Sequence, residues 1–436
     1  MQKTELKPRS VKKAWMYYDW ANSVYSLVIS TAIFPIYYAS ITANETSDQV
    51  SLFGWEITNT VLYSYSLSFS FLLVVILSPV LSSLADLSSR KKEFLKFFCY
   101  MGAVAVAALF FFDSIETLWI GILGTIVASV GFWGSQVFYN AFLPEIAPKK
   151  EQDKLSGKGF ALGYLGSSIL MILLMAFIQF HNSFGVSDAG FATRISFVIV
   201  AIWWAGFAQI TFKGLPKSGD RIKIKSHHIL DGYKQLRVTW NKFQGINGIK
   251  IFLLGFFLLS TGVQTIILLA TPFGTKVLGM ESTQMIVTIL IIQFVAIVGS
   301  QFFSRLSGKI GNIKALTITL FIWAAISVFA WSLQAEDPLV EYKFYLMGGL
   351  VGLVMGGVQS LARSTYSKML PSKGEHTTFF SFYDVTEKMA IVIGTFFFGF
   401  IEEISGDMHN SALFLAVFFI ASIFVMSRVN YNFKED

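Results

Sequence analysis

The chain has 436 residues, of which 54% are hydrophobic and only 14% are charged. A soluble domain is about one quarter charged, so this composition excludes a soluble globular protein and indicates a polytopic membrane protein. The net charge of +7 is spread among loops and forms no basic soluble module, which excludes a nucleic-acid-binding protein. The single cysteine, Cys99, excludes a disulfide or a cysteine metal site within one chain.

Apolar segments long enough to cross a bilayer, which takes about 20 residues, recur along the whole chain. The first of them follows a basic N-terminus and is too long for the core of a signal peptide, so we expect a retained spanning helix. Twelve spans are expected, at 14–41, 57–85, 94–112, 117–142, 158–180, 191–212, 248–275, 283–307, 313–333, 343–367, 378–401 and 411–428.

The lysines and arginines fall almost entirely on one side of these spans. Of the 34 basic residues, only Arg194, Lys276 and Lys343 lie in segments expected on the other side. By the positive-inside rule, both termini are therefore expected in the cytoplasm. The lipid bilayer is thus the first expected partner of the chain.

The longest cytoplasmic segment divides the spans six and six. The expected fold class is an all-α polytopic membrane protein of two six-helix bundles, 1–212 and 248–436, joined by a cytoplasmic linker at 213–247. Basic turns recur at matching places, with "LADLSSRKKEF" after the second span and "LSGKIGNIKAL" after the eighth. Repeated six-span halves are typical of two-bundle transporters.

A polar stripe runs along the first span, from Asp19 through Asn22, Ser23 and Ser26 to Ser30. This spacing places the five side chains on one face of an α-helix. A charge at the centre of a membrane costs about 2.5–3.5 kcal/mol, so the stripe is expected to face a bundle interior or an aqueous cavity. Asp19 has three possible roles: binding the cationic part of a substrate, carrying a coupled proton, or forming a structural pair with a basic side chain.

Other expected spans also carry polar side chains. In the eleventh span Asp384 and Lys388 are four residues apart and can pair along the helix, beside Glu387. A buried glutamine taken singly is better explained by an interhelical hydrogen bond. Collectively, the residues expected to line a substrate or coupling cavity are Asp19, Asn22, Ser26, Gln136, Asn140, Gln264, Gln359, Arg363, Asp384 and Lys388.

Enzyme signatures are absent from the sequence. All five histidines fall in expected loops, and no metalloprotease, nucleophile-elbow or phosphate-binding-loop motif is found. We therefore expect no enzyme activity, no catalytic residues, no metal and no cofactor. Any energy for transport is expected to come from ion gradients.

The turn "SSLADLSSRKK" is similar to the signature between spans two and three of the major facilitator superfamily. Asp86, Arg90 and Lys91 match that signature, whereas Leu87 replaces its first basic residue and serines replace its glycines. The resemblance implies a gating role for Asp86, Arg90 and Lys91. We add Glu145, at the cytoplasmic end of the fourth span, to these expected gating residues.

A resemblance over nearly the whole chain is carried by "YYDWANSVYSLVISTAIFPIYY", "FYNAFLPEIA", "GVQTIILLATPFG" and "GGVQSLARSTYSKMLP". These stretches resemble the vacuole-effluxer-like branch, which groups the amino-acid effluxer of fungal vacuoles with bacterial relatives. This implies transport of a small solute, with amino-acid efflux as the best-known case. The mechanism expected for two halves that rock about a central site is alternating access, with protons as an expected coupling ion. Many relatives carry an acidic residue just before this glycine, at the position of Thr261 in this chain, where Gly262 follows. If that acid takes part in ion coupling, the coupling of this chain differs.

Two alternatives to this function stay open. The richness in aromatic residues permits a drug or lipid exporter on the same fold, and a non-transporting scaffold or receptor would have a degenerate transporter fold. The simple basic N-terminus without targeting additions favours a bacterial inner membrane over a vacuole.

Overall fold

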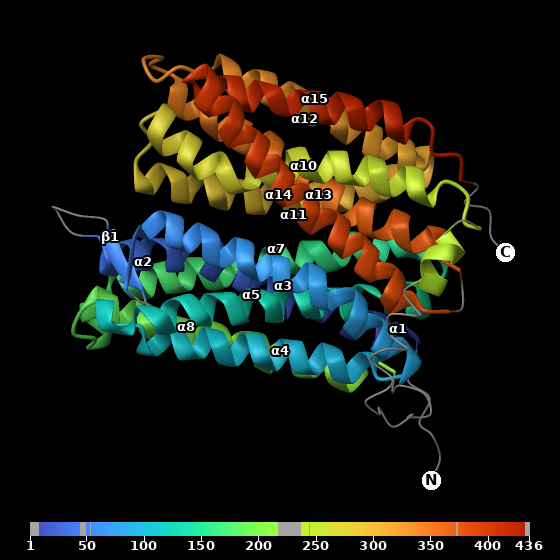
Figure 1. Ribbon diagram of the computed structural model, residues 1–436, viewed down its shortest axis with the longest axis horizontal. Coiled ribbons are helices and arrows are strands. Elements are labelled where there is room, and N and C mark those ends of the chain that lie inside the picture. Colours follow the sequence, from blue (N-terminus) through green and yellow to red (C-terminus); the bar gives the residue numbers. More distant parts are fainter. Residues whose placement is uncertain are drawn as a thin grey trace, which may run out of the picture. The chain divides into compact units, whose positions relative to one another are not determined.

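The computed structural model describes residues 8–43, 49–52, 54–216, 237–243, 245–371 and 374–431. The described chain is almost entirely helical (Figure 1). Its first half contains α1 (Pro8–Val24), η1 (Tyr25–Ile33), α2 (Phe34–Thr42), β1 (Gln49–Leu52), β2 (Trp55–Thr58), α3 (Asn59–Leu87), α4 (Lys91–Ala108), η2 (Leu109–Phe111), η3 (Ile115–Thr117), α5 (Leu118–Asn140), α6 (Leu143–Ile146), α7 (Lys149–Gln179), η4 (His181–Phe184) and α8 (Ala189–Gly214). Its second half contains α10 (Ile249–Pro272), η5 (Phe273–Val277), α11 (Ser282–Ile310), α12 (Asn312–Ser332), α13 (Val340–Met369), α14 (His376–Ser405) and α15 (Met408–Met426).

A helix occupies each of the twelve expected spans. Eleven helical segments in the described ranges are long and apolar enough to cross a membrane. The expected span at 378–401 is occupied by α14, which has 30 residues but carries three charged side chains in its first half: Asp384, Glu387 and Lys388. The expected fold class, an all-α polytopic membrane protein, is confirmed.

The first span is not the continuous α-helix that the polar stripe assumed. Between α1 and α2 the chain forms a π-helix, η1, in which the Thr31 hydroxyl donates to the carbonyl oxygen of Ser26 at 2.8 Å. The α-helical period therefore ends at Val24, so the spacing argument holds for Asp19, Asn22 and Ser23 but not for Ser26 and Ser30. π-Helical turns are rare and are frequent at functional sites.

The segment expected as a loop between the first two spans contains a β-hairpin. Strands β1 and β2 pair antiparallel, with Gln49 opposite Thr58 and Leu52 opposite Trp55. Farther along, Asp188 caps α8 by accepting the Phe191 N–H at 2.7 Å. This bond, together with the Ser187 hydroxyl, lowers the pKa of the Asp188 carboxyl, as expected for an acid at a helix N-terminus.

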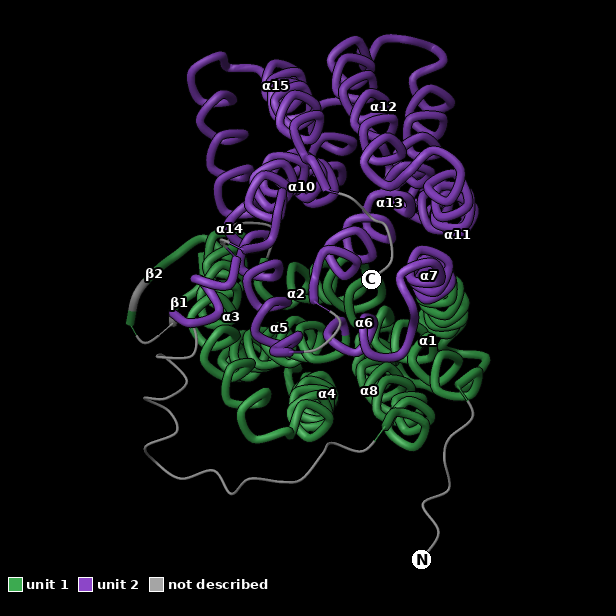
Figure 2. Tube along the Cα trace, turned by 90° about the vertical axis from the view of Figure 1, so that its right-hand side faces the viewer, with its two compact units in different colours: residues 1–139, 162–225 green, residues 140–161, 226–436 purple. Residues whose placement is uncertain are grey.

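The helices pack into two units (Figure 2). Unit 1 comprises 1–139 and 162–225, and unit 2 comprises 140–161 and 226–436. The segment 140–161 therefore packs with the second half of the chain, and α7 begins in unit 2 and continues in unit 1. Within unit 1, α8 packs against both α1 and α4, and within unit 2 the main pairs are α11 with α13 and α12 with α15.

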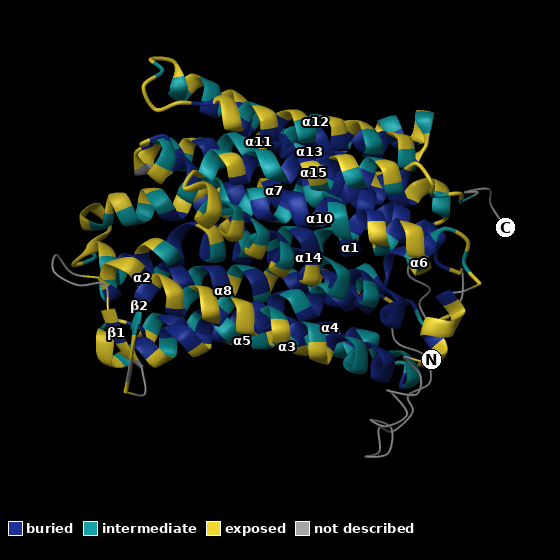
Figure 3. Ribbon diagram, turned by 45° about the horizontal axis from the view of Figure 1, so that its top comes forward, coloured by how far each residue is buried: buried dark blue, intermediate teal, exposed yellow. Residues whose placement is uncertain are grey.

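Apolar side chains are distributed as a membrane environment requires. On α3, Tyr65, Phe69, Leu72 and Ile76 are exposed and follow helical spacing, so they form one apolar stripe. The opposite face of α3 buries small serines, which allow close helix packing. Figure 3 shows buried and exposed residues on the same helices, as on α8. The exposed apolar faces are suited to contact with acyl chains.

Candidate functional site

Asp19 is buried inside unit 1, with 3% of its surface exposed. The hydroxyl of Tyr139, on α5, donates to Asp19 Oδ2 at 2.7 Å. Tyr139 is itself held by Trp15, whose ring stacks on it at 4.6 Å between centroids and whose Nε1 donates to the Tyr139 carbonyl oxygen at 3.0 Å. The orientation of Asp19 away from lipid, expected from the stripe, is thus present, and a tyrosine hydroxyl is one of its partners.

Asn22 lies one turn after Asp19 and is completely buried. Within the described structure, neither its Oδ1 nor its Nδ2 has a hydrogen-bond partner, and the same holds for the hydroxyl of Tyr18 one turn before it. Buried polar groups without partners are costly, and in native proteins they call for a ligand or a water. Ser26 and Gln136, the other expected cavity residues of unit 1, are half-buried.

The expected gating residues of unit 1 lie in the turn between α3 and α4. The backbone N–H of Arg90 donates to the Ala85 carbonyl oxygen at 2.9 Å, which closes the turn. Asp86 and Lys91 flank it at the helix ends. Lys92 was not expected from the sequence to have a role. It is buried and donates from Nζ to the Leu215 carbonyl oxygen at 2.8 Å, which connects α4 to the end of α8.

Arg363, on α13 in unit 2, is 2% exposed. Its guanidinium donates to Ser156 Oγ at 2.9 Å, to the Ser156 carbonyl oxygen at 3.1 Å and to Asn140 Oδ1 at 3.4 Å. Its Cζ lies 4.0 Å from the ring centroid of Phe160. The structure thus joins two expected residues, Asn140 and Arg363, and adds Ser156 and Phe160, while Gln359 lies one turn away and is half-buried.

Three charged side chains of α14 form a cluster in unit 2. Lys388 Nζ lies 3.1 Å from Asp384 Oδ1 and 2.8 Å from Glu387 Oε2. Gln264 on α10 donates from Nε2 to Glu387 Oε1 at 3.0 Å. The pair expected from the spacing of Asp384 and Lys388 is present, and the structure brings Gln264 to it through Glu387, which the sequence analysis noted only as a neighbour.

A second network in unit 2 was missed by sequence reasoning. Asp153, at the start of α7, accepts from Ser307 Oγ at 2.8 Å, Asn312 Nδ2 at 2.8 Å and Lys368 Nζ at 2.6 Å. All four side chains are buried. The network connects the segment 140–161 to α11, α12 and α13, so it holds that segment within unit 2.

Glu145, expected as a gating residue, contacts a histidine that was wrongly expected in a loop. His376 is the first residue of α14 and is buried. Its Nδ1 lies 3.0 Å from Glu145 Oε1, and its Nε2 lies 2.8 Å from the Pro371 carbonyl oxygen. Both ring nitrogens therefore face oxygen atoms.

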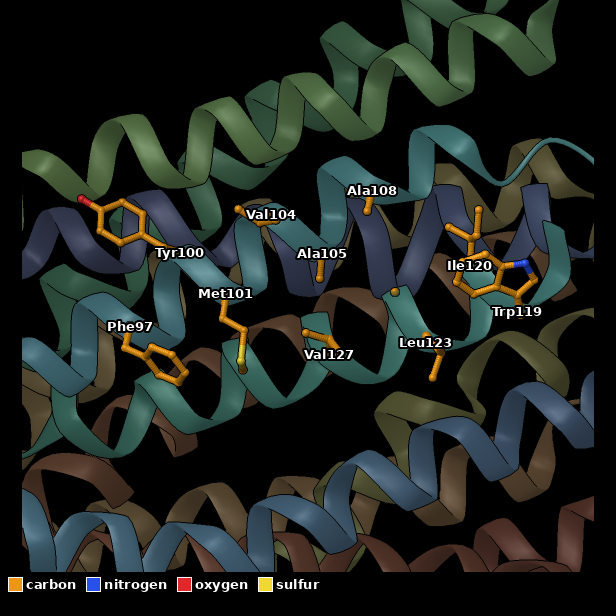
Figure 4. Close-up of a pocket in the computed structure, with 11 residues that line it drawn as sticks. Phe97, Tyr100, Met101, Val104, Ala105, Ala108, Trp119, Ile120, Leu123 and Val127 are labelled. Carbon is orange, nitrogen blue, oxygen red and sulfur yellow. The ribbon is translucent and has the colours of Figure 1, made fainter.

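An apolar groove of about 570 Å³ lies between α4 and α5 (Figure 4). Its walls include Phe97, Met101, Val104, Trp119 and Leu123. Such a surface suits an acyl chain better than a polar solute. Within the described residues, no group of three or more histidine, cysteine, aspartate or glutamate side chains could hold a metal ion.

Comparison with known proteins gives one family match over the chain. The model of the family described as vacuole effluxer Atg22-like matches residues 7–434. An uncharacterized MFS-type transporter, YxiO of Bacillus subtilis, is 29% identical over 98% of this chain and 96% of its own length. Autophagy-related protein 22 of Yarrowia lipolytica is 24% identical over 88% of this chain and 78% of its own.

Solved structures show the same fold. The proton:xylose symporter XylE matches with a TM-score of 0.71 at 14% identity, over 97% of this chain and 95% of that one. The transporter FucP in its outward conformation matches with a TM-score of 0.69 at 12% identity, over 98% and 99% of the two chains. At such identities the likeness shows the fold alone, and that fold is the one of the major facilitator superfamily.

Proposed function

The chain belongs to the vacuole effluxer Atg22-like family, and from this premise we propose that it is a secondary active transporter that moves a small solute of the amino-acid class by alternating access. Its relatives and structural neighbours are membrane transporters of the MFS type, not enzymes. We propose efflux as the direction, in keeping with the family's description.

The observation that carries the substrate class is the set of buried charges inside the helices. Asp19 lies in unit 1, and Arg363 and the α14 cluster lie in unit 2. Each such charge costs about 2.5–3.5 kcal/mol to place in a membrane, so charges of this kind usually serve a substrate or ion. A free amino acid carries a carboxylate and an ammonium, which a guanidinium and buried carboxylates complement.

Alternating access is supported by an interruption in the first span. Between α1 and α2 the chain forms π-helix η1, which is followed by Pro35. In the second half, π-helix η5 follows Pro272 and ends the seventh span rather than interrupting it. Interrupted helices are a pointer to a transport site. Spans that are already irregular can bend during transport without breaking an α-helical ladder.

The roles of the individual residues follow from this mechanism. Asp19, Asn22, Ser26, Gln136, Asn140, Gln264, Gln359, Arg363, Asp384 and Lys388 are proposed to line the substrate or coupling cavity. Asp86, Arg90, Lys91 and Glu145 are proposed to stabilise a closed cytoplasmic side. Their support is their position at helix ends beside turns, where small changes of helix orientation alter charge contacts.

The proposed location is a bacterial inner membrane with both termini in the cytoplasm. Its support is the one-sided distribution of lysine and arginine and the similarity to a bacterial relative that covers almost all of both chains. A reporter fused at Ser218 is expected to read as cytoplasmic. An extracytoplasmic reading would contradict this orientation.

A second candidate, an exporter of drugs or lipids, is favoured by the groove between α4 and α5. That groove offers an apolar cargo about 570 Å³ of space. It contains none of the buried charged groups, so under this alternative those charges would serve only ion coupling. A non-transporting scaffold would have no use for them.

Counterflow exchange in proteoliposomes tests the proposal. The purified full-length chain is reconstituted with an internal mixture of unlabelled L-amino acids, and uptake of each labelled amino acid is followed. We expect at least one label to rise transiently above equilibrium, in contrast to a labelled sugar and to protein-free liposomes. Movement of a fluorescent lipid or a drug alone would favour the exporter, and movement of no compound would reject transport.

A further inference from the structure

The α14 cluster contains one cation and two anions. Lys388 is completely buried and contacts both Asp384 and Glu387. Among the described residues, the charges of these two carboxylates act on Lys388, and the charges of Lys388 and Glu387 act on Asp384. With all three groups ionised, the cluster therefore carries one excess negative charge.

Among the described residues, the helices packed against α14 place no further cation in the cluster. α10 contributes the uncharged amide of Gln264 to the cluster, and α15 carries no aspartate, glutamate, lysine or arginine. On α13, the charge of Arg363 acts on Tyr383, one residue before Asp384, and its guanidinium is bound to Ser156 and Asn140. Tyr366, also on α13, faces Tyr383 at 5.2 Å between ring centroids and carries no charge as a phenol.

The two carboxylates differ in how well they are satisfied. Each oxygen of Glu387 has a donor, the amide of Gln264 on one side and the ammonium of Lys388 on the other. Asp384 Oδ1 forms an ion pair with Lys388, but Asp384 Oδ2 is buried and has no hydrogen-bond partner among the described residues. A buried charged oxygen without a donor costs more than a neutral hydroxyl in the same place.

We propose that Asp384 is a proton-binding site, in which Oδ2 takes up the one proton that neutralises the cluster of Asp384, Glu387 and Lys388. Proton binding follows from the geometry alone, and only its use to drive transport rests on the proposed function. When the proton is bound, Lys388 pairs with Glu387 and the cluster is neutral. When it leaves, the cluster holds an uncompensated charge that favours access to water.

The surroundings allow a proton to reach Asp384. The Glu387 side chain is 17% exposed and Gln264 is half-buried, so the polar edge of the cluster is accessible while Asp384 and Lys388 are enclosed.

Infrared difference spectroscopy of the full-length chain in lipid, without any solute, tests the site directly. A protonated carboxylic acid has a carbonyl stretching band that a carboxylate lacks, and this band is recorded as the pH is changed. We expect a titrating band in the wild type that is lost in Asp384→Asn. The band should stay in Glu341→Gln, a control in unit 2 that removes a carboxylate hydrogen-bonded by Tyr345.

Isotope labelling separates the candidate acids without any substitution. Carboxyl-labelled aspartate should shift the band to lower wavenumber, whereas labelled glutamate should leave it in place. A shift with glutamate would assign the proton to Glu387, and loss of the band in Asp19→Asn would assign it to the first span. Either result, or the absence of any titrating band, would overturn the proposal.

The variants also guard against a folding artefact. Asp384→Asn leaves Lys388 and Glu387 as a one-to-one pair, so we expect it to fold, and Asp384→Glu should keep a titrating band. Because the spectra need no substrate, a titrating band in a chain that shows no counterflow would leave the proton site standing and reject the transport proposal. Counterflow by a chain that shows no titrating band would reject the proton site and leave the transport proposal standing.

Discussion

Tyr139 supports the buried carboxylate of the first span with a single hydroxyl. Replacing it in Tyr139→Phe removes the donor to Asp19 Oδ2 but keeps the ring that stacks on Trp15. Hydrogen bonds to charged groups contribute about 1.5–3 kcal/mol, so we expect a comparable loss of stability and a lower Tm in detergent. Tyr100→Phe is the control, because the Tyr100 hydroxyl bonds Gln209 at an exposed position. Equal Tm values for the two variants would mean that Tyr139 does not support Asp19.

Asp153 anchors the segment 140–161 to unit 2 through three buried donors. Asp153→Asn leaves the ammonium of Lys368 buried without its anion, and breaking a buried pair in this way costs about 3–5 kcal/mol. We expect faster hydrogen exchange at the start of α7. The neighbouring variant Lys154→Gln, at an exposed position, should exchange like the wild type. If both variants exchange alike, the network does not hold the segment.

For individual residues, the sequence predicted the side-chain pair that lies on a single helix and did not predict the network that joins several helices. Asp384 and Lys388 could be paired from their spacing alone because four residues make one helical turn. Asp153 could not be found in this way, because its partners come from three helices more than 150 residues later in the chain. Its position in a basic cytoplasmic segment suggested only a role in topology.

Among the elements, α11 and α13 are packed so closely that two glycines of α13 leave no room for a Cβ atom against the α11 backbone. A Cβ atom at Gly356 would overlap the carbonyl oxygen of Ala296, and one at Gly352 would overlap that of Ile292. Gly356→Ala should therefore force the helices apart and cost about 1–3 kcal/mol, seen as a lower Tm.

Gly349→Ala is the matched control for this contact. Its Cβ would meet only Ile291 Cγ2 at 3.9 Å, which is ordinary van der Waals contact. Since alanine also favours the helix, this variant should be neutral or slightly stabilising. A Tm for Gly356→Ala as high as that of Gly349→Ala would show that the two helices can separate without loss.

The positions of the spans were predictable because length and hydropathy alone determine which segments can cross a bilayer. The breaks within them were not. Residues 25–33 read as ordinary apolar helix, and the π-helix arises from hydrogen bonds that composition does not encode. The hairpin at β1 and β2 was hidden for a similar reason, because its short polar strands resemble a loop.

For the whole molecule, the sequence was sufficient for the fold and the family but not for the site. Two six-span halves with basic turns at matching places already pointed to a transporter, and the family match over residues 7–434 agrees. The cluster at Asp384 needed the structure, because the excess charge becomes evident only once Lys388 is seen to contact both carboxylates and Gln264 is seen to satisfy one of them.

Solute accumulation driven by an imposed pH gradient tests the account most directly. Proteoliposomes containing the wild-type chain are given a pH gradient of each polarity in turn, and the labelled amino acid found by counterflow is followed. One polarity is predicted to drive accumulation that a protonophore abolishes, while Asp384→Asn exchanges solute but does not accumulate it. Accumulation under neither polarity, or accumulation by Asp384→Asn equal to that of the wild type, would contradict proton-coupled transport through this cluster.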